Sequence, residues 1–121
     1  MTWDQARNMA GCELVELGAH TVTHPALVGL GGVARSREIT ESKRACEAII
    51  GAPVVAFAYP YGDFDAETRE VVKTAGFAFA CGTQNGPANA TSDIFALPRI
   101  YAPDLAGDEF EQALHTVCAF G

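Results

Sequence analysis

Two histidines four residues apart, His20 and His24, lie in the segment LGAHTVTHP and are the side chains best suited to chemistry. This spacing on a helix, with a glutamate after the first histidine, is typical of zinc proteases. Here Thr21 stands in place of that glutamate, and Pro25 disfavours helical geometry at His24. The sequence therefore predicts a turn after a strand. It leaves two interpretations open: a metal-binding pair, or two partly buried loop histidines that hydrogen-bond to the backbone.

A second group of interest, Tyr59-Pro60-Tyr61-Gly62, lies at the end of the apolar run PVVAFAYP. Aromatic rings offer a rigid wall for a small apolar group and a face against which sugar rings can pack. The alternative is a turn that only ends a core strand. A pocket is favoured if this turn lies beside the histidines, so the choice depends on the elements that position both groups.

Helical and extended segments alternate along the chain. We expect helices at about residues 3–10, 33–50, 66–75 and 107–119, strands at about 12–20, 53–60, 77–81 and 94–102, and a polar loop at 82–93. Such alternation indicates βαβ units and a parallel sheet, in which sites form at the carboxyl ends of the strands. The histidines and the Tyr-Pro-Tyr-Gly turn both follow such ends. We therefore expect them to share one site.

The helix ends carry capping signals. Thr2 with Gln5 is a capping-box pattern, Asp65 is an N-cap, and Gly51 and Gly76 are stop signals. The residues of the long helix predicted to lie on one apolar face are Ile39, Ala45, Cys46, Ile49 and Ile50.

Size and composition predict a single domain over residues 1–121. A net charge of −7 argues against nucleic acid or an anionic membrane as the partner. No apolar run reaches the ~20 residues needed to cross a bilayer, and the first residues lack the pattern of a signal peptide. The cysteines at positions 12, 46, 81 and 118 form no Cys-x-x-Cys motif, so buried free thiols are expected.

Together, ELGAHTVTHPAL and AFAYPYGDFD resemble the middle of a NodB-type polysaccharide deacetylase (carbohydrate esterase family four) over about residues 3–79. His20, Thr21 and His24 match the family's His-[Ser/Thr]-x-x-His motif, whose histidines bind a divalent metal, usually zinc. The turn matches the end of the family's Arg-x-Pro-Tyr motif. Ala58 occupies the arginine position, as in the exopolysaccharide-deacetylase branch.

The resemblance implies an α/β fold, a partial irregular (β/α) barrel in which parallel strands alternate with helices. It also implies metal-dependent hydrolysis of N- or O-acetyl groups on a polysaccharide or oligosaccharide, in a family that is often extracytoplasmic. In this interpretation His20 and His24 bind the metal, and the Tyr61 N–H stabilises the oxyanion. The residues expected to contact substrate are Tyr59, Pro60, Tyr61, Gly62 and Arg99.

Two parts of the family pattern, its first aspartate motif and its late histidine motif, have no clear counterpart. The first family motif contains two adjacent aspartates, a base and a metal ligand, and this chain has no Asp-Asp. Asp4, Asp63 and Asp65 are weak substitutes, and His115 is expected to be a surface residue. We therefore expect the carboxyl-terminal part of a deacetylase domain, with little activity by itself. The alternative is a non-catalytic metal- or glycan-binding module that keeps the pocket. An open edge at residues 12–20 would also favour self-association.

Overall fold

The computed structural model describes residues 1–118. Its elements in chain order are α1 (Trp3–Ala10), the 3-10 turn η1 (Leu27–Gly29), α2 (Gly32–Ile50), β1 (Ala56–Ala58), the 3-10 turn η2 (Pro60–Gly62), α3 (Ala66–Thr74), β2 (Phe79–Asn85), β3 (Leu97–Arg99) and α4 (Gly107–Cys118). None of these helices is long and apolar enough to cross a membrane.

The three strands form one parallel sheet in the order β1-β2-β3. Phe57 pairs with Ala80, and Cys81 pairs with Leu97. Parallel neighbours need a crossover, and α3 supplies the one between β1 and β2. Within residues 1–118 the sheet does not close on itself. The predicted α/β fold, an open part of a (β/α) barrel, is confirmed.

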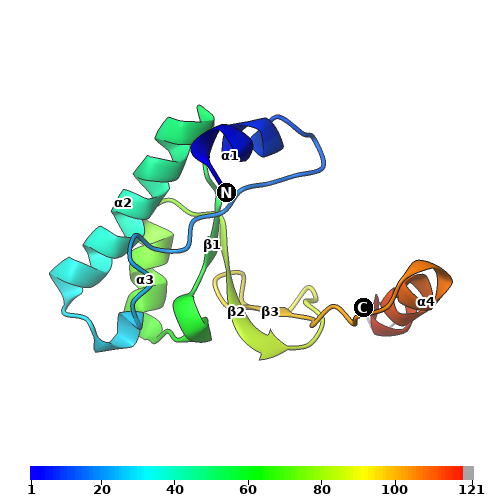
Figure 1. Ribbon diagram of the computed structural model, residues 1–121. Coiled ribbons are helices and arrows are strands. Elements are labelled where there is room, and N and C mark those ends of the chain that lie inside the picture. The colour runs from blue at the N-terminus through cyan, green and yellow to red at the C-terminus, as the bar shows by residue number, and fades with distance from the viewer. Residues whose placement is uncertain (119–121) are drawn as a thin grey trace.

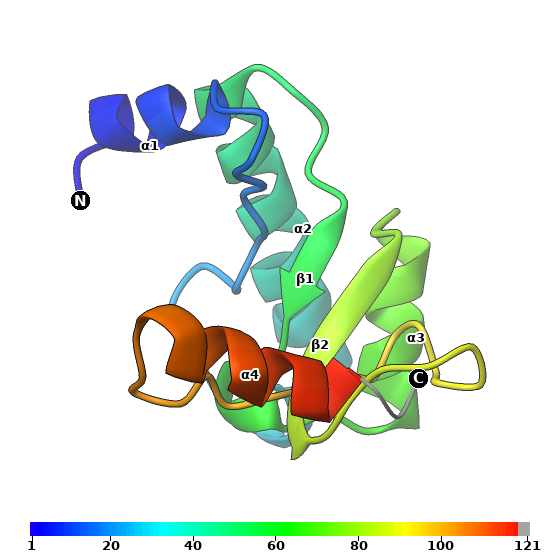
Figure 2. The same ribbon diagram turned by 90° about the vertical axis from the view of Figure 1, so that its right-hand side faces the viewer.

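Helices α2 and α3 cover one face of the sheet, as Figure 1 shows. The core lies between these helices and the sheet, and its largest fully buried apolar residues are Leu27, Ile39, Val54, Phe57, Tyr59 and Val72. On the strands, buried Phe57 and Ala80 alternate with half-buried Ala56, Ala58 and Cys81. Figure 2 shows α4 crossing in front of the other face of the sheet, and Figure 1 shows it standing apart from the strands.

The capping predictions are confirmed. Thr2 and Gln5 form both bonds of a capping box, and the Asp65 side chain accepts the N–H of Thr68. Gly51 and Gly76 have φ values of 70° and 87°, the left-handed conformation expected after a helix.

The predicted strand at residues 12–20 is wrong except at its end. Only Ala19 pairs with the sheet, opposite Phe57, while Leu14 is 95% exposed. The chain makes a turn at residues 12–15, where the Val15 N–H donates to Cys12 O. With Ala19 opposite Phe57 in a parallel register, earlier residues would face positions before Ala56, where β1 begins. The segment before Ala19 therefore has no strand to pair with among the described residues.

Two further expectations need correction. On the predicted apolar face of α2, Ile39 is buried and Cys46 and Ile50 pack against the core, but Ala45 is exposed, and the polar residues Arg35 and Ser42 are buried instead. The predicted loop at residues 82–93 begins later, because backbone pairing with β3 extends β2 to Asn85.

The expectation of buried thiols holds only in part. Cys46 and Cys81 are half-buried, Cys12 is exposed, and all three are free. The side chain of Cys118 and the predicted helical residue Ala119 lie outside the described residues.

Candidate functional site

The first half of the candidate site is the histidine turn, residues 20–24, which directly follows the residue paired with the sheet. The Ala19 N–H donates to Ala56 O at 2.9 Å, and the Ala58 N–H donates to Ala19 O at 3.0 Å. His20 Nδ1 lies 2.8 Å from Ala58 O. Because a carbonyl oxygen only accepts, Nδ1 carries the proton, and Nε2 of the neutral ring keeps its lone pair. His20 is therefore fixed to β1 in the tautomer that can bind a metal through Nε2.

His24 lies between His20 and Tyr61. The ring centroids of His20 and His24 are 4.7 Å apart, and so are those of His24 and Tyr61. Both contacts are edge-to-face, a favourable geometry at this distance. The structure thus brings the histidines and the second predicted group together at the carboxyl end of β1.

Backbone strain is concentrated in the same place. Thr21, His24 and Tyr61 have φ values of 65°, 60° and 59°, and they are the non-glycine residues with positive φ in residues 1–118. Such conformations cost about 1–3 kcal/mol each and persist only where the surroundings enforce them. For a β-branched residue such as Thr21 the conformation is especially uncommon. Strain of this kind often gathers at functional sites.

A carboxylate from α2 holds the histidine turn. Glu38 Oε2 accepts the N–H of Val22 at 2.8 Å and that of Thr23 at 2.9 Å, while Oε1 accepts the Thr23 hydroxyl at 2.7 Å. Partial burial acts to raise the pKa of Glu38. The hydrogen bonds from Thr23 and Val22, with nearby Arg37, outweigh it and lower the pKa. Glu38 is therefore charged at neutral pH.

The second half of the site is the aromatic turn, residues 59–62, which is built by close packing. Gly62 has φ 68°, and a Cβ atom there would lie 2.0 Å from Thr83 Oγ1 on β2. The Gly62 N–H donates to Tyr59 O at 2.9 Å, and the Asp63 N–H donates to Pro60 O at 3.0 Å. Only glycine allows the turn to approach β2 this closely. Tyr61 is left 68% exposed beside His24.

Tyr59 and Pro60, predicted to contact substrate, are both fully buried. The Tyr59 ring stacks on Phe64, and its hydroxyl donates to Phe95 O at 2.8 Å. Burial raises the pKa of Tyr59 to about 12, against the opposing effect of Arg69. Neither residue offers a surface to a ligand in this structure, so a substrate contact stays a prediction. Their position in the core fixes the start of the turn.

Arg99 lies at the end of β3. Its Nε donates to Gly82 O at 2.8 Å, and the side chain lines a pocket of about 300 Å³ with Thr83 and Tyr101. Thr83 also contacts Gly62, so this pocket adjoins the aromatic turn rather than the histidines. The predicted substrate contact of Arg99 stays a prediction.

The donor set for a metal is incomplete among the described residues. Residues 1–118 hold no cluster of three or more His, Cys, Asp or Glu side chains able to bind one ion. Two imidazoles fit part of a catalytic zinc site, which usually has three protein ligands. Asp65 is occupied as the cap of α3, where hydrogen bonds from Thr68 lower its pKa.

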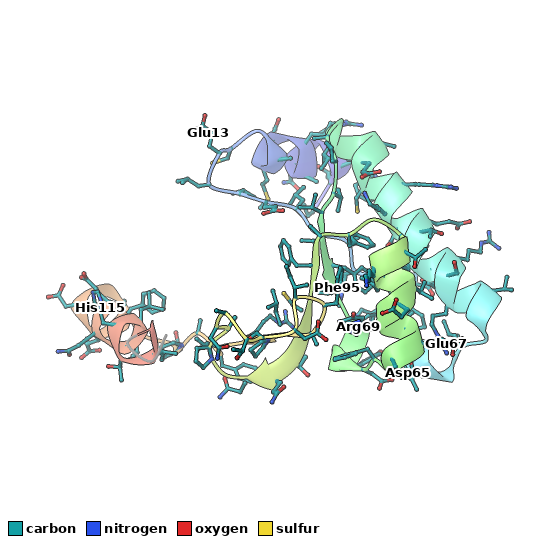
Figure 3. The ribbon with its side chains drawn as sticks, turned by 180° about the vertical axis from the view of Figure 1, so that it is seen from behind. Glu13, Asp65, Glu67, Arg69, Phe95 and His115 are labelled. Carbon is teal, nitrogen blue, oxygen red and sulfur yellow. The ribbon has the colours of Figure 1, made fainter. Side chains whose placement is uncertain are left out.

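The other weak candidates lie elsewhere. Asp4 pairs with Arg7 at 2.7 Å in the first helix. His115 is exposed on α4, far from the labelled residues of α3 in Figure 3, which confirms that it is a surface residue.

Sequence reasoning missed the residues that support the site. Arg35 is buried, and its guanidinium donates to Leu27 O at 3.1 Å and Leu30 O at 2.9 Å. Its Nη1 also lies 2.9 Å from Glu67 Oε2, on α3. Arg35 therefore ties the segment after the histidine turn to both helices.

A second missed pair holds the loop that covers Tyr59. Arg69 binds Asp93 through two hydrogen bonds, of 2.6 and 2.8 Å, and its guanidinium lies over the Phe95 ring, as Figure 3 allows the reader to follow. The hydrogen bond from Arg69 is the main cause of the lowered pKa of Asp93. An acidic residue in a polar loop and an arginine on a helix give no sequence signal of such pairing.

Comparison with known proteins finds relatives that share this architecture. YxkH of Bacillus subtilis (strain 168), which bears the name of a polysaccharide deacetylase, is 25% identical over 111 residues, covering 91% of this chain and 39% of that protein. The deacetylase PplD of Streptococcus pyogenes, solved in complex with acetate, superposes with a TM-score of 0.83 at 25% identity over 97% of this chain and 50% of its own. BC0361, a polysaccharide deacetylase from Bacillus cereus, has a TM-score of 0.79 at 22% identity over 97% of this chain and 36% of its own, a likeness of fold.

This chain therefore spans half or less of the length of each of these three relatives. The family model for polysaccharide deacetylases matches residues 1–80, which contain both the histidine turn and the aromatic turn. On that match, the chain belongs to the polysaccharide deacetylase family.

Proposed function

We propose that this chain contributes to the metal-dependent hydrolysis of acetyl groups on a polysaccharide or oligosaccharide, with His20 and His24 as ligands of a divalent metal, zinc being the best candidate. The observation that carries the proposal is the contact of His20, His24 and Tyr61 at the end of β1, with ring centroids 4.7 Å apart. The hydrogen bond from His20 Nδ1 to Ala58 O supports it, because it leaves Nε2 available as a ligand.

Each residue has a distinct task in this proposal. A bound divalent metal polarises a carbonyl oxygen and provides a nucleophile at neutral pH. His20 and His24 hold that ion, and the backbone N–H of Tyr61 donates to the oxyanion that forms as the acetyl group is attacked. The Tyr61 ring, which is exposed beside His24, packs against the sugar. Gly62 keeps the turn close to β2, and Arg99 binds the substrate from the adjoining pocket.

A second candidate function is a metal- or glycan-binding module without catalysis. It is favoured by the finding that residues 1–118 hold no group of three or more His, Cys, Asp or Glu side chains able to bind one ion. Both functions require the histidines. They differ in whether acetate is released.

Acetate release tests the proposal. The protein would be incubated with acetylated chito-oligosaccharides and zinc, and acetate would be measured for the wild type and for His24→Ala, each with and without a chelator. The proposal predicts only a small release by this chain, because the aspartate pair of the family's first motif has no counterpart here, and it predicts that this release depends on both zinc and His24. Glycan binding without any zinc-dependent release would favour the non-catalytic module. Release that is unchanged in His24→Ala would contradict the assignment of the histidines.

A further inference from the structure

The two histidines of the turn are held by different parts of the fold. His20 is attached to β1, both by its own ring and through the pairing of Ala19. Within residues 1–118, His24 makes no such hydrogen bond with the sheet. The only hydrogen bond found for its backbone N–H in the described residues is to Thr21 Oγ1, at 3.0 Å. The position of His24 relative to His20 therefore depends on what fixes the residues between them.

Those residues are fixed by one side chain of α2. The three donors between the histidines that point at the helix are the N–H groups of Val22 and Thr23 and the Thr23 hydroxyl, and all three donate to Glu38. Glu38 lies 15 positions beyond Thr23, so this is a tertiary contact. Both of its oxygens are occupied by the turn. Glu38 also belongs to no cluster of three metal-binding side chains in residues 1–118, so it is directed at the backbone and not at an ion.

The backbone conformation makes this support necessary. Thr21 and His24 both have left-handed φ values, which a chain of non-glycine residues does not keep without external constraint. A charged carboxylate that accepts from two successive N–H groups and a hydroxyl supplies that constraint, because hydrogen bonds to an ionised acceptor are stronger than neutral ones. Without it, His20 would stay on β1, while His24 would keep only its bond to Thr21 and its ring contacts with His20 and Tyr61.

From these contacts we infer that Glu38 is a positioning residue for the metal site: it sets the place of His24 relative to His20 and thereby sets metal affinity. This inference rests on the proposed function of the two histidines as ligands. Residues that orient metal ligands typically change affinity by about 10–100-fold when they are replaced.

The test uses zinc as the probe and two matched variants of α2. Glu38→Gln keeps the size of the side chain but removes its charge and turns one acceptor into a donor. Glu41→Gln is the control, because Glu41 lies on the same helix and lines the same pocket of about 360 Å³, yet its carboxylate accepts from Arg37 Nε and not from the turn. Zinc affinity and the NMR shifts of both imidazoles would be measured for each protein.

The inference predicts that Glu38→Gln weakens zinc binding at least about tenfold, whereas Glu41→Gln stays within about twofold of wild type. In Glu38→Gln the His20 ring should keep its wild-type shifts without zinc, and only the zinc response of His24 should be lost. Equal affinities in the two variants would overturn the inference. So would an equal disturbance of both histidines without zinc, which would mean a general structural role. If zinc moves neither imidazole in the wild type, the proposed function and this inference both fail.

Discussion

The histidine turn and the aromatic turn meet at the same end of the sheet but are held by different forces. The segment at residues 20–30 is held by charged side chains of α2, through Glu38 on the backbone N–H groups and Arg35 on the carbonyl oxygens. The aromatic turn is held by packing, with Tyr59 in the core and Gly62 against Thr83. Packing contacts are sensitive to volume, and polar contacts are sensitive to the loss of one partner.

The largest effect is expected at the packed turn, from Gly62→Ala. The new Cβ atom would lie 2.0 Å from Thr83 Oγ1, at a residue with φ 68°. The clash and the left-handed backbone together should lower the free energy of unfolding by about 3 kcal/mol or more, measured by urea denaturation.

Gly51→Ala is the matched control for that change. Gly51 has φ 70°, but nothing lies within 4 Å of its Cβ position, so only the backbone strain of about 1–2 kcal/mol is expected. Adding Thr83→Ala to Gly62→Ala should recover part of the loss. Equal losses at the two glycines would contradict the packing account of this turn.

A somewhat smaller effect is expected at the polar segment, from Arg35→Met. The change leaves Leu30 O without its guanidinium donor, leaves Leu27 O with only the N–H of Leu30, and removes the ion pair with Glu67, while the apolar side chain fills the space. We expect a loss of about 2–3 kcal/mol in the free energy of unfolding. Arg37→Met removes an exposed pair with Glu41 on the same helix and should change stability by less than about 0.5 kcal/mol. Similar losses in both variants would mean that the buried contacts of Arg35 contribute little.

The smallest of these effects, and one that varies with pH, is expected for Tyr59→Phe. At neutral pH the loss of the hydrogen bond to Phe95 O should cost about 1–2 kcal/mol. The folded pKa of Tyr59 is raised to about 12 from an ordinary value of 10. The raised pKa therefore contributes stability that is fully present below pH ~10 and is lost as the pH rises toward ~12. Stability curves of wild type and Tyr59→Phe should approach each other over that interval. A constant difference up to pH 12 would place the Tyr59 hydroxyl in contact with solvent.

The features predicted correctly from sequence are those with local signals. The Thr2–Gln5 pair and Asp65 predict where two helices begin, and Gly51 and Gly76 predict where two helices end. These signals can be read from sequence because each residue acts on the backbone within a few positions of itself. The meeting of the two turns followed from a general property of parallel sheets.

The features that were missed depend on tertiary contacts. An apolar run at residues 12–20 looks like a strand, but pairing needs a partner, and β1 offers one only to Ala19. Nothing in the sequence around Glu38 or Arg35 indicates that their charges face the backbone of a distant turn. Tyr59 and Tyr61 look equivalent in sequence, yet the turn that begins at Pro60 leaves Tyr59 in the core and exposes Tyr61.

The central claim is that His20 and His24 together bind a divalent metal, and a calorimetric zinc titration tests it most directly. Wild type, His20→Ala and His24→Ala would be compared under identical conditions. The account predicts weak one-to-one binding by the wild type, because two imidazoles make an incomplete site, and a further loss of at least about tenfold in either variant. Tight one-to-one binding that survives His20→Ala would contradict it.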